Sequence, residues 1–163
     1  MARQVFYSFH YLPDSWRAAK IRNIGMIEGN RPAPDNDWET ITNQGEEAIK
    51  RWIKNQMRYR SCTVVLVGNN TANRKWINHE IIESWNAGMG VVGIRIHGIT
   101  DRAGNVSQPG NNPFDSITFG DGLLSSVVKC YNPVGSTSQE RYNWISQHLA
   151  NAVAEAIKIR NEN

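Results

Sequence analysis

The amino-acid sequence predicts a three-layer α/β domain with a mostly parallel central sheet, and two observations carry this prediction. Short apolar runs rich in β-branched and aromatic residues alternate along the chain with longer segments whose apolar positions recur at helical spacing. The 163 residues, 40% hydrophobic and 20% charged, have the size and composition of one globular domain. We therefore expect residues 1–163 to form a single domain in which strands and helices alternate.

Three runs are predicted to be buried parallel strands, because each is almost continuously apolar and too short for a stable helix. They are QVFYSF (4–9), CTVVLVG (62–68) and VVGIRIH (91–97). A weaker run, SVVKCY (126–131), is predicted to be an edge or late strand. Cys62 and Cys130 lie within two of these runs, which indicates buried free thiols in a reducing cytosol.

Four segments have helical periodicity. They are a helix or turn that begins near Asp14 or Ser15, residues 45–60, residues 73–85 and residues 138–160. Gly88 and Gly90 end the third helix in the manner of a glycine C-cap, and Ser138 is the predicted N-cap of the last. Residues 25–44 and 98–122 are instead rich in turn-forming residues. Loops of this length inside a compact domain favour a functional role or disorder.

Charge and hydropathy exclude several classes of function. The formal net charge is only +3 and the chain has no basic tract, so nucleic-acid binding is not expected. The apolar runs are too short to span a bilayer, and the N-terminal residues do not resemble a signal peptide, so we expect a cytoplasmic protein without a membrane partner. The four histidines are scattered and no zinc-binding spacing occurs, so we expect no metal site.

Two predicted strand ends bring chemically useful residues to one rim of the sheet. Ligands of open parallel sheets bind beyond the carboxyl ends of the strands, where Phe9, His10 and Tyr11 follow the first strand. The helix after the second long apolar run carries Glu80 one turn beyond Trp76. Periodicity alone leaves two interpretations of Glu80, a solvated residue at the edge of the apolar face or the working group of a cleft.

Four stretches together resemble the TIR-like family that includes the Thoeris anti-phage TIR proteins. They are VFYSFHYLPDSWRAAKIRN, DNDWE, SCTVVLVGNNTANRKWINHEI and NPFD, between about residues 4 and 115. Enzymatic TIR domains have a catalytic glutamate in a W-x-x-x-E spacing, which Trp76 and Glu80 meet here. The resemblance implies a flavodoxin-like fold and cleavage of the nicotinamide–ribose bond of NAD, often with cyclisation or transfer of the ADP-ribose product. NAD is then a substrate, and no cofactor is expected.

Cleavage of the nicotinamide–ribose bond, which the resemblance implies, would give Glu80 a chemical role. Breaking the bond between ribose and nicotinamide leaves positive charge on the sugar, as in glycoside hydrolysis. A carboxylate beside the ribose stabilises that charge. Nicotinamide is already cationic in NAD and leaves without a strong general acid, so Glu80 can suffice without a second carboxylate.

The other candidate site residues are expected to bind substrate. They are Ser8, Phe9, His10, Tyr11, Arg17, Trp38 and Trp76. The aromatic side chains either stack on a base or pack into the core. Arg17 either binds a pyrophosphate or is an ordinary surface residue. Trp38 either packs the first long loop (residues 25–44) against the rest of the domain or lines the pocket. Phe114 of the NPFD motif is expected to anchor the second long loop.

The sequence is compatible with two functions from different classes. The first is an NAD-consuming enzyme whose product signals to a separate effector protein during phage infection. The second is a TIR-like protein-interaction module without catalysis, since one fold hosts many functions. A response-regulator receiver is disfavoured, because the first strand does not end in acidic residues. A homo-oligomer is compatible with either function, and the group that attacks the ribose is left open.

Overall fold

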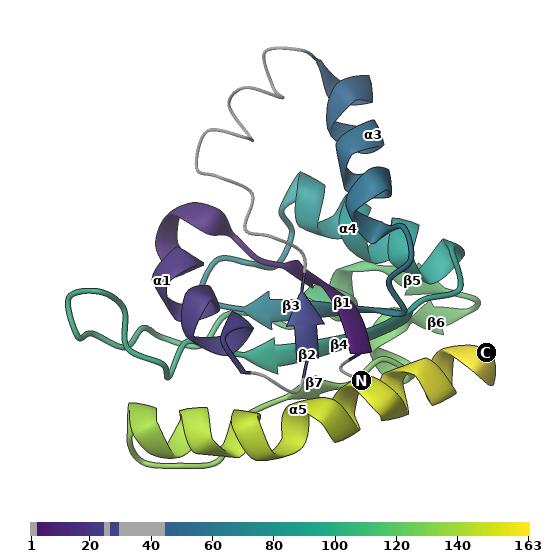
Figure 1. The fold of residues 1–163 in the computed structure, drawn as a ribbon. Helices are drawn as coiled ribbons and strands as arrows, with labels where there is room; N and C mark the ends of the chain where they lie inside the picture. The colour runs from purple at the N-terminus through teal and green to yellow at the C-terminus, as the bar shows by residue number, and fades with distance from the viewer. Residues whose placement is uncertain (1–2, 25–26, 30–44) are drawn as a thin grey trace.

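The computed structural model describes residues 3–24, 27–29 and 45–163, and a five-stranded parallel sheet lies at its centre (Figure 1). The strands are β1 (Arg3–Ser8), β2 (Ile27–Gly29), β3 (Cys62–Val67), β4 (Gly90–Arg95) and β7 (Cys130–Tyr131). They lie in the order β2-β1-β3-β4-β7, and each neighbouring pair is parallel. Counted along the chain, this is the 2-1-3-4-5 order of flavodoxin-like folds, which confirms the predicted fold class.

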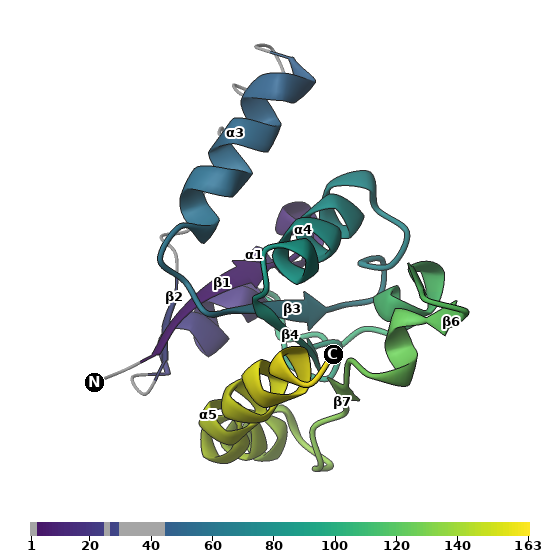
Figure 2. The ribbon, with the colours of Figure 1, turned by 90° about the vertical axis from the view of Figure 1, so that its right-hand side faces the viewer.

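Helices cover both faces of the sheet, which gives the expected three layers (Figures 1 and 2). The long helices are α1 (Tyr11–Arg22), α3 (Glu46–Met57), α4 (Lys75–Asn86) and α5 (Ser138–Asn161). Helix α1 begins earlier than predicted, with Pro13 in its first turn, where the missing amide hydrogen costs no helical bond. Short elements fill the connection from β4 to β7, namely η1 (Pro113–Ser116), β5 (Thr118–Phe119), β6 (Gly122–Leu123) and η2 (Leu124–Ser126).

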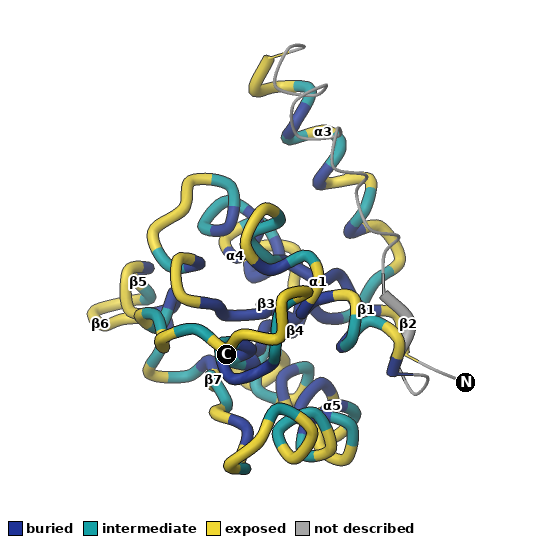
Figure 3. The backbone as a smooth tube through the Cα atoms, turned by 90° about the vertical axis from the view of Figure 1, so that its left-hand side faces the viewer, coloured by how far each residue is buried: buried dark blue, intermediate teal, exposed yellow. Residues whose placement is uncertain are grey.

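Side chains alternate along β1 and so contribute to two separate cores. Val5 and Tyr7 pack with α1 and α5 on one face, whereas Phe6 packs with α3 on the other. Ser8 follows Phe6 on the second face and therefore points toward α4. Figure 3 shows that buried residues concentrate in the strands and in the helix surfaces that face them. The polar Ser8 is thus placed in an apolar layer, where it needs a hydrogen-bond partner.

Two predictions about strands and loops are wrong in part. Residues 25–44 were expected to form a loop, yet Ile27–Gly29 pair with Arg3–Val5 as the edge strand β2. The late strand expected over residues 126–131 contains only Cys130–Tyr131, because a 3-10 turn occupies Leu124–Ser126. Both departures occur at sheet edges, where short strands pair through backbone atoms and leave little pattern in the sequence.

The end of α4 confirms one of the two glycines predicted as C-caps. Gly88 has a φ of +82°, the left-handed conformation that ends a helix, and its amide donates to the carbonyl of Trp85. Gly90 instead begins β4. A Cβ atom at Gly90 would lie 2.7 Å from the backbone nitrogen of Ile157, so the absence of a side chain lets α5 pack closely on this strand.

The second long loop is anchored as predicted. Phe114 is fully buried in the core formed by β3 and α4, and the side chain of Asn112 accepts a hydrogen bond from its amide. Cys62 is buried and Cys130 is partly buried, and both are free thiols.

The N-cap of α5 is Thr137, so the prediction of Ser138 is wrong. The Thr137 hydroxyl accepts a hydrogen bond from the amide of Glu140, whereas the Ser138 hydroxyl accepts from the amide of Thr100. We expect Thr137→Ala to lower the free energy of unfolding by about 1 kcal/mol, the usual cost of losing a cap. Urea unfolding followed by circular dichroism measures this loss. A variant as stable as the wild type would contradict the capping role.

Candidate functional site

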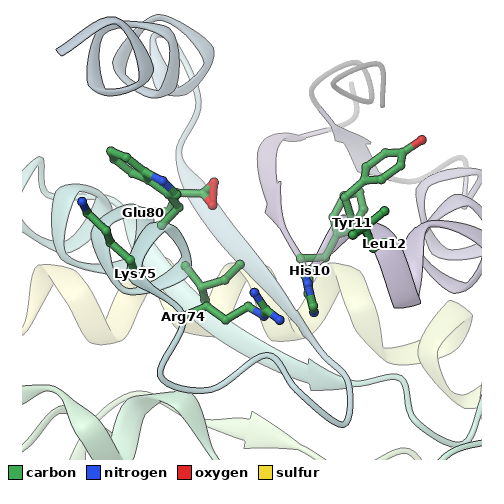
Figure 4. A pocket seen from close by; sticks show the side chains of 9 residues that line it. His10, Tyr11, Leu12, Arg74, Lys75 and Glu80 are labelled. Atoms are coloured by element: carbon green, nitrogen blue, oxygen red, sulfur yellow. The ribbon is translucent and has the colours of Figure 1, made fainter. Parts of the chain in front are cut away.

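A pocket of about 300 Å³ opens at the carboxyl ends of β1 and β3 (Figure 4). Its walls come from the residues that follow β1 and from the first turns of α4. They are Phe9, His10, Tyr11, Leu12, Arg74, Lys75, Trp76, Ile77 and Glu80. The two walls are adjacent because β1 and β3 are neighbouring parallel strands, and Ser8 pairs in register with Val65. The pocket therefore lies where the strand order predicts a ligand site.

Glu80 lines this pocket although the side chain is only 2% exposed. It lies on the face of α4 that also buries Ile77, Ile81 and Ser84. The Ser8 hydroxyl donates a hydrogen bond of 3.3 Å to Glu80 Oε1. In Figure 4 the Glu80 carboxyl group extends from α4 toward the wall that carries His10 and Tyr11. The structure thus excludes the solvated-edge interpretation of this glutamate.

Burial raises the pKa of Glu80 well above its usual value, and the hydrogen bond from Ser8 opposes this rise. A carboxylate without solvating water interacts strongly with any positive charge that enters the pocket. A cationic ligand would in turn lower the pKa of Glu80 and favour its ionised form. Strongly perturbed carboxyl groups in a cleft are typical of functional sites.

We expect Ser8→Ala to raise the pKa of Glu80 further, because the variant loses the hydrogen bond that stabilises the carboxylate. Carbon-13 NMR titration of the Glu80 carboxyl group measures this shift. Ser84→Ala is the matched control, since the Ser84 hydroxyl bonds to the backbone carbonyl of Glu80 and not to its carboxyl group. Equal pKa values of Glu80 in the wild type and Ser8→Ala would show that Ser8 does not influence the carboxyl group.

Aromatic rings provide flat apolar surfaces around the carboxyl group. The rings of Phe9 and Tyr11 stack with centroids 6.0 Å apart. Trp76 contacts the α3 core cluster with one part of its surface and lines the pocket with another. Its ring also meets His79 edge-on at 5.5 Å. These surfaces suit a planar heteroaromatic ligand, which gains stacking contacts on each exposed ring.

His10 lies in the pocket wall that follows β1. Burial lowers the pKa of its imidazole, and the neighbouring Arg74 guanidinium lowers it further, so the ring is neutral near pH 7. His10 Nδ1 is buried and has no hydrogen-bond partner among the residues that the structure describes. A neutral imidazole in the pocket wall can accept a proton from a bound hydroxyl.

Two cationic residues of the pocket were not among the binding residues predicted from the sequence. Arg74 and Lys75 stand at the beginning of α4, and their side chains reach the same cavity as Glu80 (Figure 4). Lys75 forms an ion pair with Glu46 at the start of α3. The sequence did contain an indication, because the first turn of a helix that follows a parallel strand always lies at the ligand-binding rim.

Arg17, predicted to bind substrate, does not line the pocket. Its side chain is buried on the other side of α1, where the guanidinium donates to the carbonyls of Ile99 and Asn105 and pairs with Asp14. These contacts hold residues 98–105 against α1. Trp38, the candidate binding residue in the first long loop, lies outside the described residues.

The described part of the chain contains no group of three or more His, Cys, Asp or Glu side chains placed to hold a metal ion. Within those same residues, each helix is too short or too polar to cross a bilayer. The ionisable side chains that line the pocket include Glu80, His10 and the two cations at the start of α4, and Tyr11 and Trp76 add a hydroxyl and an indole N–H.

Comparisons with known proteins identify the family. A protein of Bacillus cereus (strain MSX-D12) named "Putative cyclic ADP-D-ribose synthase ThsB1" is 31% identical over 159 residues, which cover 94% of this chain and 82% of that protein. Residues 6–101 match the family described as "Thoeris protein ThsB, TIR-like domain", and this range includes both walls of the pocket. The chain therefore belongs to the Thoeris ThsB family of TIR-like proteins.

Proposed function

We propose that this protein cleaves the nicotinamide–ribose bond of NAD and releases an ADP-ribose-derived nucleotide that signals phage infection to a separate effector protein. The buried Glu80 carboxyl group in the pocket is the observation that carries the proposal. The name of the Bacillus cereus relative supports the same chemistry. The free thiols of Cys62 and Cys130 suit the reducing cytoplasm, where NAD is available.

The geometry supports a dissociative cleavage of the glycosidic bond. As nicotinamide leaves, positive charge develops on the ribose, and the Glu80 carboxylate is the acidic side chain that lines the pocket. Low solvation strengthens the attraction between this carboxylate and the sugar cation. The departing nicotinamide carries no net charge once its electron pair has been recovered, so no acid has to protonate it.

The second half of the reaction determines the product. Attack on the ribose by water would give free ADP-ribose, whereas attack by a group of the same molecule would give a cyclic product. The side chains of Phe9, Tyr11 and Trp76 offer apolar surface in the pocket where the sugar would lie. Neutral His10 lines the same pocket and can accept the proton of an attacking hydroxyl, whether this belongs to water or to the same molecule. We favour cyclisation because of the name of the relative.

Product analysis tests the proposal. We expect cells that express the protein to release nicotinamide on phage exposure and to accumulate a nucleotide with the mass of ADP-ribose minus one water. Liquid chromatography with mass spectrometry, before and after exposure and with uninduced cells as control, measures both products. Free ADP-ribose would support cleavage but contradict cyclisation. Unchanged NAD under every trigger would contradict the enzymatic proposal.

A second candidate function is a non-catalytic interaction module, and exposed apolar side chains on α1 are compatible with it. Leu12 is 87% exposed and Trp16, one turn later, is 47% exposed. Contiguous exposed apolar surface is typical of protein contacts, and Leu12 also lines the Glu80 pocket. The same surface would suit assembly of an enzyme into a homo-oligomer, so these residues do not discriminate between the two functions, whereas NAD consumption does.

A further inference from the structure

Arg74 is a cation of the pocket with unused hydrogen-bonding capacity. Its Nε donates to the backbone carbonyl of Asn70 at 3.0 Å, and the residue is exposed at the pocket rim. The two terminal amino groups of the guanidinium make no hydrogen bond or ion pair with any residue described by the structure. Lys75 differs, since its ammonium group is already paired with Glu46. In Figure 4 the Arg74 guanidinium extends toward His10 across the pocket.

The beginning of α4 adds a second source of positive potential to the same corner. Arg74 is the N-cap residue of this 12-residue helix, no side chain caps its first amides, and its first turn contains no acidic residue. The first helical hydrogen bond runs from the amide of Asn78 to the carbonyl of Arg74, so the preceding amides remain without helical partners. Such amides, together with the helix dipole, favour an anion.

The distance between this corner and Glu80 suits a nucleotide. Glu80 is the sixth residue after the N-cap Arg74, which corresponds to about 9 Å along the helix axis. This span is comparable to one ribose with its 5′ phosphate. An anion bound by Arg74 would therefore leave the attached ribose within reach of the Glu80 carboxyl group. The planar guanidinium also matches two phosphate oxygens better than an ammonium group does.

We propose that Arg74, assisted by the first amides of α4, binds the pyrophosphate of NAD and thereby places the nicotinamide-bearing ribose against Glu80. This inference rests on the proposed function, because it takes NAD as the ligand. It assigns a direction to the substrate, with the nicotinamide ribose at the buried end of the pocket and the pyrophosphate at the rim. Arg74 is then a binding residue that contributes to substrate affinity rather than to bond cleavage.

Ligand titrations of variants test this assignment without requiring catalysis. ADP-ribose contains the pyrophosphate and nicotinamide riboside lacks it, and isothermal calorimetry measures the affinity of each. We expect Arg74→Gln to weaken ADP-ribose binding roughly 10- to 100-fold, the loss typical of charge-assisted hydrogen bonds, and to leave nicotinamide riboside unaffected. Arg51→Gln, an equal charge change at an exposed position of α3, is the control and should alter neither affinity.

Activity measurements provide an independent readout. We expect Arg74→Gln to raise KM for NAD with little change in kcat, and Arg74→Lys to recover part of the affinity. Unchanged ADP-ribose affinity in Arg74→Gln, an equal loss for both ligands, or no ADP-ribose binding by the wild type would each overturn the assignment. Arg74-dependent ADP-ribose binding without any NAD cleavage would instead refute the proposed function and leave the pyrophosphate site standing.

Discussion

Glu80→Gln is expected to reduce the rate of NAD cleavage at least about 100- to 1,000-fold, the range found when a group that stabilises transition-state charge is removed. Glutamine keeps the size of the side chain and can still accept the hydrogen bond from Ser8. It lacks the negative charge that the ribose cation requires. The loss should therefore appear in kcat, with substrate binding largely preserved. The initial rate of nicotinamide release at several NAD concentrations, measured by liquid chromatography, gives kcat and KM.

The same substitution is expected to raise the free energy of unfolding, relative to the wild type, at pH values where Glu80 ionises in the unfolded chain. Burial raises this pKa in the folded protein, so the folded state favours the protonated carboxyl group. The stability of the wild type is highest where Glu80 is protonated in both states, and it decreases as the pH rises through the folded-state pKa. Glutamine does not ionise. The stability advantage of Glu80→Gln should thus grow with pH, as measured by urea unfolding between pH 5 and pH 9.

Glu83→Gln serves as the matched control, because it removes the same charge from the same helix. Glu83 does not line the Glu80 pocket and is more exposed than Glu80. The rate of nicotinamide release by Glu83→Gln should resemble that of the wild type. Equal nicotinamide release by Glu80→Gln and the wild type would remove Glu80 from the catalytic role, whatever happened to stability.

The parts of this fold that the sequence predicts are those with strong local patterns. Continuous apolar runs identified β1, β3 and β4, and helical periodicity identified α3, α4 and α5. The edge strand β2 could not be recognised in the same way, because it contains three residues and pairs only with β1.

The site shows the same division between local pattern and long-range contact. Strand-end topology allowed Phe9, His10, Tyr11 and Glu80 to share a cleft, the family resemblance singled out Glu80, and all four residues line one pocket. The bond from Ser8 to Glu80 joins residues 72 positions apart, and no periodicity indicates such a contact. The guanidinium of Arg17 bonds to a carbonyl 82 positions away, which is why its structural role could not be distinguished from phosphate binding in the sequence.

Arg17→Met is expected to lower the free energy of unfolding by about 3–5 kcal/mol at neutral pH, the typical cost of removing one partner of a buried ion pair. Arg17 and Asp14 are 4% and 1% exposed. Without the guanidinium, the Asp14 carboxylate loses its cation, and the carbonyls of Ile99 and Asn105 lose their donors. Equilibrium urea unfolding measures the loss. If Arg17 instead bound substrate, the variant would keep its stability and show a higher KM for NAD.

Two further measurements isolate the ion pair as the cause of this loss. Burial raises the pKa of Asp14 and Arg17 opposes the rise, so the pKa of Asp14 should increase further in Arg17→Met. The stability difference from the wild type should therefore shrink as the pH falls and Asp14 takes up a proton. The double variant Asp14→Asn, Arg17→Met has no buried charge left unpaired and should recover part of the lost stability at neutral pH. A double variant as unstable as the sum of its single variants would show that loop contacts, rather than the unpaired carboxylate, dominate the cost.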